Sequence, residues 1–466
     1  MPDLATSLPH PVDGGRTYVF TVRPGVRYSD GATVKASDFV RGTRRALLNR
    51  KGNPSLYSAV VGAKSCLDNP GFPNLCDISR GVVADDATGR VTFHLETADP
   101  EFLAKLTMFV VATPEEAPLT DMGFTPMPST GPYRITHTTV DGALTLERNP
   151  YFVPWSFAAQ PSGYADTIVR QVKPSEEAAV TAVLSGVSDV VTVLDPTPVA
   201  ESHPAQLHQV DALNTDFMYL NPRLPPFNDV RVRRAINYAV DRKELVRLYG
   251  HGDGYALPTC QMLPPRFPSY SRYCPYQSGP PDGPYLGPDF PKALQLVRDS
   301  GTTGTRIVIH ALQGQSLWSA YPAYFASVLT RLGYAVTFEP IPASSAPGYP
   351  DDPAYAAYQI FTQQGWNADY PAPSNFYSVL FACHQPNLSG YCNRTIEARA
   401  QQAAALAATE PNAALAAWTT VDKLLTDDAA FVALGNRWHN QLVSERVGNY
   451  VGQPVSGAIL SQLWVR

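Results

Sequence analysis

The segment PPFNDVRVRRAINYAVDRKELVRLYG, residues 225–250, has the clearest pattern of local structure in the chain. Its first half predicts a helix, because Asn228 and Asp229 belong to the residue types that cap helix starts. The apolar positions that follow recur at helical spacing and form one stripe: Val232, Ile236, Ala239 and Val240. We therefore expect one face of this helix to be buried.

The second half of the same segment predicts another helix. Asp241 can accept hydrogen bonds from the first free backbone N–H groups, and Glu244 three residues later completes the pattern of a capping box. Gly250 marks the end, because glycine adopts the left-handed backbone that follows many helices. Two consecutive helices are therefore expected here.

Strand and helix patterns alternate along the rest of the chain. Alternating apolar and polar residues predict strands at 17–23 and 90–97, and Asp141-Gly142 predicts the turn of a hairpin. Strand–helix–strand patterns follow at 166–194 and 306–342, and an Ala-rich pair of helices precedes short strands at the C-terminus. These patterns predict an α/β protein with mixed sheets in at least two lobes.

The composition is that of an ordinary folded protein without strong charge. The 466 residues are 44% apolar and 17% charged, and 41 acidic against 36 basic residues give a net charge of −5. No basic run of the kind that binds phosphate backbones occurs, which argues against a nucleic-acid partner. No apolar stretch reaches the ~18 residues that a membrane helix needs, and no segment near the N-terminus resembles a signal peptide.

Six cysteines fall into three couples of near neighbours: Cys66 and Cys76, Cys260 and Cys274, Cys383 and Cys392. No couple has C-x-x-C spacing and no histidines cluster beside them, so a zinc site is not expected. Many pairings are possible, and the short intervening loops favour the local one. Three disulfides in loops predict an oxidising compartment, whereas the alternative is six buried free thiols.

No motif of a catalytic type stands out. The sequence has no G-x-S-x-G, no H-E-x-x-H, no phosphate-binding loop and no calcium-binding loop. We therefore predict no catalytic residues, no metal and no cofactor.

A second segment, GWNADYPAPSNF at 365–376, contains the most informative candidate site. Asp369 stands between Trp366 and Tyr370, and a carboxylate held against aromatic rings costs free energy unless a cation or several donors meet it. A ligand ammonium would satisfy both residue types, because aromatic faces also attract cations. The alternative is a turn in which Asp369 caps backbone amides and Trp366 packs in the core. The residues alone favour the turn slightly.

Several segments, in order, resemble those of one family. They are TYVFTVRPGVRYSDGATVKASDFV (17–40), STGPYRI (129–135), ERNPYF (147–152), PPFNDVRVRRAINYAVDRKELV (225–246) and GWNADYPAPSNF (365–376). Together they resemble the extracytoplasmic solute-binding proteins of oligopeptide and dipeptide ABC importers, family 5. The resemblance spans nearly the whole chain, and the stretch at 225–242 is its most specific part.

This resemblance implies an α/β fold of the periplasmic-binding-protein type, in its three-domain, peptide-binding form, in which two lobes close on ligand about a hinge. It leads us to expect the small domain of the first lobe at 1–125, its main domain at 126–225 with 436–466, and the second lobe at 226–435. It also implies that the family's opening strands and export signal are missing, so we expect a misassigned start, a fragment, or a piece cut from a larger fusion.

The same resemblance implies capture of peptides or related solutes outside the cytoplasm and delivery to the membrane subunits of an ABC permease. It implies a monomer, anchored to the cell envelope as a lipoprotein in its full-length form. In peptide-binding members the matching aspartate receives the ligand's α-ammonium beside a pocket-lining tryptophan, which carries over to Asp369 and Trp366. We add Gly365, Asn367 and Tyr370 as ligand-binding candidates. Asn367 stands where several members have a bridging cysteine.

Other functions stay open on the sequence. The chain could be the ligand-sensing domain of a regulatory protein, or a receptor for a non-peptide solute, since the family also carries nickel chelates, haem and oligosaccharides. The cysteine couples favour transport, because a cytosolic sensor has little use for disulfides. An enzyme has no support, because the sequence offers no nucleophile or metal motif.

Overall fold

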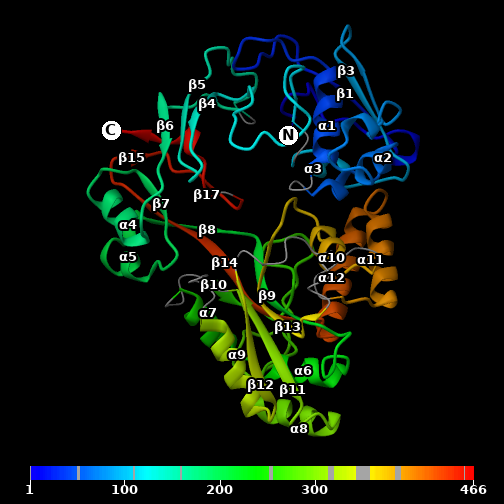
Figure 1. The fold of residues 1–466 in the computed structure, drawn as a ribbon, viewed down its shortest axis with the longest axis vertical. Coiled ribbons are helices and arrows are strands. Elements are labelled where there is room, and N and C mark those ends of the chain that lie inside the picture. The colour runs from blue at the N-terminus through cyan, green and yellow to red at the C-terminus, as the bar shows by residue number, and fades with distance from the viewer. Residues whose placement is uncertain are drawn as a thin grey trace. The chain divides into compact units, whose positions relative to one another are not determined.

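The computed structural model describes residues 2–49, 53–108, 111–157, 160–250, 256–312, 320–342, 357–383, 390–455 and 457–466 (Figure 1). The chain forms two compact units. Unit 1 contains residues 1–189, 445–451 and 458–466, and unit 2 contains residues 190–444 and 452–457. The predicted three-domain division, with its boundaries at 125, 225 and 435, stays a prediction.

Unit 1 contains two small antiparallel sheets, each with three strands. The first has the order β1 (Thr17–Thr21), β3 (Arg90–His94), β2 (Val82–Asp85). The second has the order β4 (Tyr133–Thr138), β5 (Leu144–Arg148), β6 (Thr167–Arg170). The helices of this unit are α1 (Ser37–Leu48), α2 (Ala63–Leu67), α3 (Phe102–Lys105) and α4 (Glu176–Leu184).

Local patterns in unit 1 formed as the sequence predicts. Strands occupy most of 17–23 and 90–97, and the β4–β5 turn places Gly142 at a φ of 87°. Helix α4 begins after Ser175, whose hydroxyl oxygen accepts a hydrogen bond from the Ala178 N–H at 3.2 Å. The short strands β15 (Val447–Gly448) and β18 (Trp464–Val465) pair at the C-terminal end of the chain.

Unit 2 is built on a mixed sheet of eight strands. Its main path runs β10 (Ala256–Pro258), β14 (Phe431–Val443), β9 (Asn214–Leu220), β13 (Ile360–Asn367), β11 (Arg306–Leu312), β12 (Ala335–Ile341). Two further strands, β7 (Val190–Thr192) and β8 (Leu207–Asp211), pair with other parts of β14. The remaining strands of the chain are β16 (Gly452–Gln453) and β17 (Gly457–Ala458). The parallel pair β11–β12 is joined by a helix, which confirms the pattern predicted for 306–342.

The helices of unit 2 accompany two hydrophobic clusters. They are α5 (Thr197–Ser202), α6 (Val230–Ala239), α7 (Arg242–Gly250), α8 (Phe290–Ser300), α9 (Ala320–Arg331), α10 (Ser374–Leu380), α11 (Arg394–Leu406) and α12 (Pro411–Asp427). Met218 and Leu220 of β9 belong to the cluster with α6 to α9, while Phe217 and Tyr219 belong to the cluster with α10 to α12. Because side chains alternate along a strand, β9 is buried on both faces and separates the two clusters.

The C-terminal prediction of short strands is wrong for β14. This strand runs for 13 residues and pairs with β7, β8, β9 and β10. Its sequence, FVALGNRWHNQLV, mixes apolar and polar residues without a clear period, and polar members such as Asn436 and Asn440 are buried. Pairing on several partners therefore decides this strand, more than its own pattern does.

The segment at 225–250 forms the two predicted helices, with one difference at the second cap. The Asp229 side chain accepts the Arg231 N–H at 2.8 Å, and Asp241 accepts the Lys243 N–H at 3.0 Å. Glu244 does not return to the Asp241 N–H as a capping box requires, because it pairs with Arg247. A tyrosine hydroxyl from α9 takes that N–H instead.

Two arginines of this segment are buried, and their guanidinium groups bind other residues of the chain. Arg242 is 0% exposed, and its guanidinium donates to the carbonyl oxygens of Thr259 at 2.9 Å and Ala433 at 3.0 Å. It also donates to the backbone and side-chain oxygens of Asn237 at 3.0 and 2.8 Å. Arg233 pairs with Asp428 at 3.1 Å. Both side chains therefore link α6 and the start of α7 to other parts of unit 2.

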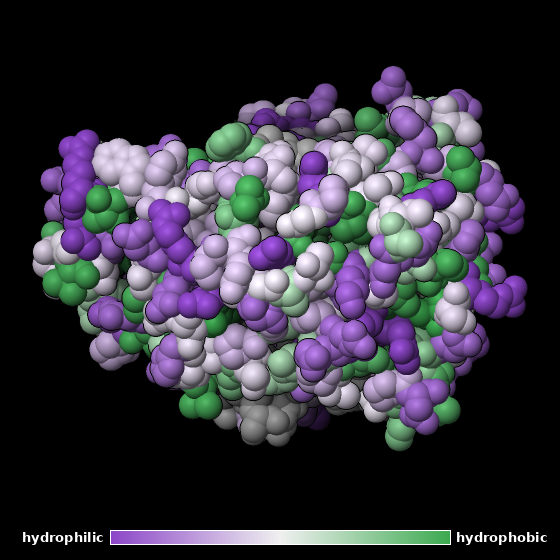
Figure 2. All heavy atoms as spheres, turned by 90° about the horizontal axis from the view of Figure 1, so that it is seen from above, coloured by the Kyte–Doolittle hydropathy of each residue, from purple (hydrophilic) through white to green (hydrophobic). Residues whose placement is uncertain are grey.

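The six cysteines form the three local disulfides. Their Cα–Cα separations are 4.1 Å for Cys66–Cys76, 4.9 Å for Cys260–Cys274 and 4.5 Å for Cys383–Cys392. The alternative of six free thiols is therefore wrong for this fold. In Figure 2, hydrophilic and hydrophobic residues are interspersed on the face shown. Among the described residues, none of the helices combines the length and apolar character that crossing a membrane requires.

Candidate functional site

The candidate site lies in unit 2, where β13 ends and α10 begins. Asp369 is partly buried in the connection, and its backbone N–H donates to Oδ1 of Asn375 at 2.9 Å. The Asn375 amide donates in turn to Oδ2 of Asp369 at 3.2 Å. The Trp366 indole Nε1 also donates to Oδ1 of Asn375, at 2.9 Å. Asn375 therefore forms hydrogen bonds with both Asp369 and Trp366, the two main candidates from the sequence.

The Asp369 carboxylate has no cationic partner among the described residues. Burial raises the pKa of the Asp369 carboxyl above its usual value, and the hydrogen bond from Asn375 acts in the opposite direction. Among the described residues, no charged side chain contributes to this shift. A partly buried carboxylate whose single side-chain donor is a neutral amide is ready to accept a positive charge from outside the chain.

The geometry bears on the alternative of a capping turn with Trp366 in the core. In the described part of the chain no backbone N–H donates to the Asp369 carboxylate, and the Asp369 N–H itself donates to Oδ1 of Asn375. Trp366 is only partly buried, and it packs against the hydrophobic cluster that contains Phe376 and Trp418. The alternative interpretation is therefore correct in part. Trp366 packs partly against the core, but the Asp369 carboxylate does not act as a cap.

Gly365 precedes these residues at a place where the backbone needs a small residue. It pairs with Asp216 of β9, and a Cβ at Gly365 would collide with Oδ1 of that aspartate. Asp216 is 2% exposed and forms an ion pair with Arg437 of β14, with 2.9 Å between Oδ2 and Nε. Gly365 therefore lets a buried ion pair approach β13, and this requirement explains the glycine.

The two remaining candidates differ in accessibility. Asn367 is exposed, and its backbone pairs with Asn214 at the end of β13. Tyr370 is 4% exposed, and its hydroxyl lies 3.4 Å from the Ser374 hydroxyl. Asn367 is accessible to a ligand, whereas Tyr370 mainly supports the loop from within.

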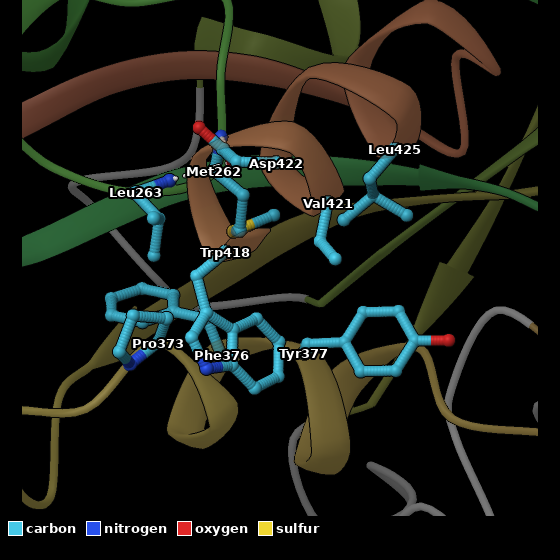
Figure 3. A pocket seen from close by; sticks show the side chains of 9 residues that line it. All are labelled: Met262, Leu263, Pro373, Phe376, Tyr377, Trp418, Val421, Asp422 and Leu425. Carbon is cyan, nitrogen blue, oxygen red and sulfur yellow. Dashed lines mark hydrogen bonds between the residues drawn. The ribbon is translucent and has the colours of Figure 1, made fainter. Parts of the chain in front are cut away.

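A small apolar pocket lies beside this segment, between α10 and α12 (Figure 3). The lining residues are Met262, Leu263, Pro373, Phe376, Tyr377, Trp418, Val421, Asp422 and Leu425. Most of them belong to the same hydrophobic cluster against which Trp366 packs. The wall behind the candidate site is therefore formed by helix packing rather than by polar groups.

Asp422 is the acidic residue among those that line this pocket. Its carboxylate accepts the backbone N–H groups of Met262 and Leu263, each at 3.2 Å, and the Gln261 side-chain amide at 2.8 Å (Figure 3). Burial raises the pKa of the Asp422 carboxyl to about 6. In Figure 3 the carboxylate is turned toward these backbone groups, so Asp422 joins α12 to the disulfide-bearing loop at 260–274.

Sequence reasoning missed Asn375 as part of this site. Asn375 stands in the quoted segment, six residues after Asp369, and it is 0% exposed. The available signal was a polar residue two positions after Pro373, since proline is favoured in the first turn of a helix. For metals, the searched part of the chain contains no group of three or more His, Cys, Asp or Glu side chains that could hold an ion.

Comparison with known proteins identifies the family. Residues 1–387 match the sequence profile of the bacterial extracellular solute-binding proteins, family 5. The chain belongs to this family. This result confirms the resemblance found in the sequence, and the family consists of solute-binding proteins of transporters rather than enzymes.

Individual relatives agree with this assignment at low identity. The "Probable deoxycholate-binding periplasmic protein" of Escherichia coli is 26% identical over 427 residues, which cover 86% of this chain and 74% of that protein. The periplasmic oligopeptide-binding protein of Escherichia coli is 25% identical over 467 residues, covering 94% and 80%. The solved structure of "Clavulanic acid biosynthesis oligopeptide binding protein 2" has a TM-score of 0.84 at 22% identity, covering 100% and 86%. The predicted fold class is confirmed.

Proposed function

We propose that this protein is the substrate-binding component of an ABC importer and that it captures peptides or peptide-like amines outside the cytoplasm. In this proposal Asp369 receives the α-ammonium of the ligand and Trp366 lines the pocket beside it. Gly365 and Asn367 contribute backbone and accessible surface. The protein acts as a monomer, without cofactor or catalytic activity, and delivers its ligand to the membrane subunits of a permease. The full-length form is anchored to the cell envelope as a lipoprotein.

The observation that carries the proposal is the uncompensated carboxylate of Asp369. A partly buried acid with only a neutral amide donor from a side chain costs free energy in the ligand-free protein. A ligand ammonium offsets that cost through a charge-assisted hydrogen bond, and a neighbouring aromatic ring adds an attraction for cations. The three disulfides agree with a place outside the cytoplasm.

The relatives suggest two ligand classes that differ in charge. One relative is named for oligopeptides and another for deoxycholate, which is an anionic steroid. Asp369 favours the peptide class, because a carboxylate attracts an ammonium and repels a second carboxylate. A receptor for a non-peptide solute is the second candidate, and its support is relatives named for deoxycholate and for haem.

Calorimetric titration with three probes tests this proposal. The tripeptide trialanine has a free ammonium, N-acetyl-trialanine lacks it, and deoxycholate represents the anionic alternative. We expect trialanine to bind the wild-type protein at least about 10-fold more tightly than its acetylated form, since a close charge pair is worth roughly 1.5–7 kcal/mol. Asp369→Asn should remove most of that preference. Equal binding of both peptides, or binding of deoxycholate alone, would overturn the assignment.

A further inference from the structure

We propose that Asn375 is the positioning residue of the ligand site, and that its single amide fixes both the orientation and the ionisation of Asp369. This inference rests on the proposed role of Asp369 as the ammonium site. In this inference Asn375 acts on the ligand through Asp369, and its effect on the ionisation of Asp369 can be measured.

The orientation of the Asn375 amide is determined by its partners. Oδ1 accepts two N–H groups, from the Trp366 indole and from the Asp369 backbone, each at 2.9 Å. A flipped amide would present its NH₂ group to two donors, which is unfavourable. Nδ2 therefore faces Oδ2 of Asp369, at 3.2 Å. Because Asn375 is 0% exposed, water does not compete readily for these bonds.

This arrangement favours the charged form of the acid. A donor to a carboxylate stabilises ionisation, whereas burial opposes it. Burial and the Asn375 hydrogen bond both act on the ionisation of Asp369, and within the described parts of the chain no charged side chain from a neighbouring element adds to them. Asn375 is thus the side chain that keeps the acid available to an ammonium as pH falls.

The same amide also holds the aromatic part of the site. The indole N–H of Trp366 is bonded to Asn375, while the rest of the side chain packs against the cluster containing Phe376. Phe376 follows Asn375 directly on α10, so the bonded amide and the packed ring come from one turn of helix. Asn375 therefore couples the orientation of Trp366 to that of Asp369.

Three substitutions separate this role from a purely structural one. Asn375→Asp keeps an acceptor for both N–H donors, but in its ionised form it donates nothing to Asp369 and adds a like charge. Asn375→Ala removes acceptor and donor together. Trp366→Phe removes one of the two donors that fix the amide and leaves the Asp369 contact in place. All three should shift the ionisation of Asp369 in the same direction, with Asn375→Asp giving the largest shift.

Asn393 provides a matched control. Its Oδ1 accepts the N–H groups of Thr395 and Ile396 at 3.1 and 3.3 Å, and its Nδ2 donates to Oδ2 of Asp428 at 3.0 Å. It therefore repeats the pattern of two N–H donors and one carboxylate at a place remote in sequence from Asp369. Asn393→Asp should leave the ionisation of Asp369 unchanged.

The experiment is a carbon-13 NMR titration of aspartate carboxyls in the ligand-free full chain, with Asp369→Asn assigning the signal. We expect Asn375→Asp to raise the pKa of Asp369 by at least about one unit, and Asn375→Ala and Trp366→Phe by less. The pH profile of trialanine affinity should shift to higher pH by the same amount. An unchanged Asp369 pKa in these variants would overturn the inference. The ligand-free titration decides this even if trialanine does not bind, which would count against the proposed function instead.

Discussion

The segments at 225–242 and 365–376 are the two most distinctive stretches of the sequence, and they use their charged residues in opposite ways. In the first, the Arg242 guanidinium is fully buried and donates four hydrogen bonds to oxygens of the chain. In the second, the Asp369 carboxylate is partly buried and, among the described residues, accepts one side-chain hydrogen bond, from Asn375. The charge of the first segment is bound within the chain, and the second segment is the one that we propose to bind a ligand.

This difference teaches how to separate a structural motif from a site within one chain. A buried charge with all of its donors or acceptors satisfied contributes to the fold, and its removal leaves other groups unpaired. A partly buried charge without a counter-charge lowers stability in the ligand-free protein and gives free energy back on binding. Distinctive sequence alone does not reveal which of the two applies.

The largest effect is expected from Arg242→Met. The substitution leaves the carbonyl oxygens of Thr259 and Ala433 and both oxygens of Asn237 without this donor. Because a buried acceptor left unsatisfied costs about 1–3 kcal/mol, the free energy of unfolding should fall by roughly 3–5 kcal/mol. Urea unfolding measures this loss. Lys243→Met, one residue further on and exposed, is the control and should change stability by less than about 0.5 kcal/mol. A small effect of Arg242→Met would contradict the claim that the first segment uses its buried charge to stabilise the fold.

The next effect is a pH dependence caused by Asp422. Its pKa in the folded protein is raised to about 6, above the value of an unfolded aspartate, so its contribution to stability is complete at low pH. That contribution is lost as pH rises toward 6 and beyond, up to about 3 kcal/mol by linkage. The unfolding free energy of wild type relative to Asp422→Asn should therefore fall between about pH 4 and about pH 7. A flat difference would show that this buried acid titrates normally.

A moderate effect is expected from Gly365→Ala. The added Cβ collides with the buried Asp216 carboxylate, and overpacking of this kind costs about 1–3 kcal/mol. Thermal unfolding measures the loss. Asn367→Ala, at an exposed position of the same strand, is the matched control. Equal stability of both variants would mean that the backbone at Gly365 moves freely away from β9.

The smallest effect, and opposite in sign, is expected from Asp369→Asn. Removing an ionised, partly buried carboxylate removes its desolvation cost, so the free energy of unfolding at neutral pH should stay equal or rise by up to about 1 kcal/mol. The neutral amide oxygen can still accept from Asn375. A clear loss of stability in the ligand-free protein would assign Asp369 to the fold, and the contrast with Arg242 would disappear.

Much of the fold could be predicted from local pattern. The helices at 230–250, the cap at Ser175 and the hairpin at Gly142 follow from residue preferences that act within a few positions. Strands β9 and β14 could not be predicted in this way, because their partners come from distant parts of the chain and buried polar residues such as Asn214 and Asn436 obscure alternation. The main strands of unit 2 are therefore a result of tertiary pairing.

The candidate site was predicted in part. The sequence indicates Asp369 and Trp366 because an acid between aromatic residues is chemically unusual. In the structure both residues donate hydrogen bonds to Asn375. The role of Asn375 depends on the bend between β13 and α10, which brings residues 366, 369 and 375 together, and no local pattern encodes that contact. For the same reason, the burial of Tyr370 could not be distinguished from exposure in a pocket wall.

Proton release on ligand binding tests the central claim most directly. If an ammonium pairs with Asp369, it lowers the raised pKa of that carboxyl, so trialanine binding should release protons at acidic pH. Calorimetry in two buffers of different ionisation enthalpy, between about pH 4 and about pH 7, measures this release. We predict release that declines toward neutral pH in the wild-type protein and is lost in Asp369→Asn. Binding of trialanine with the same proton balance in both proteins would contradict the account.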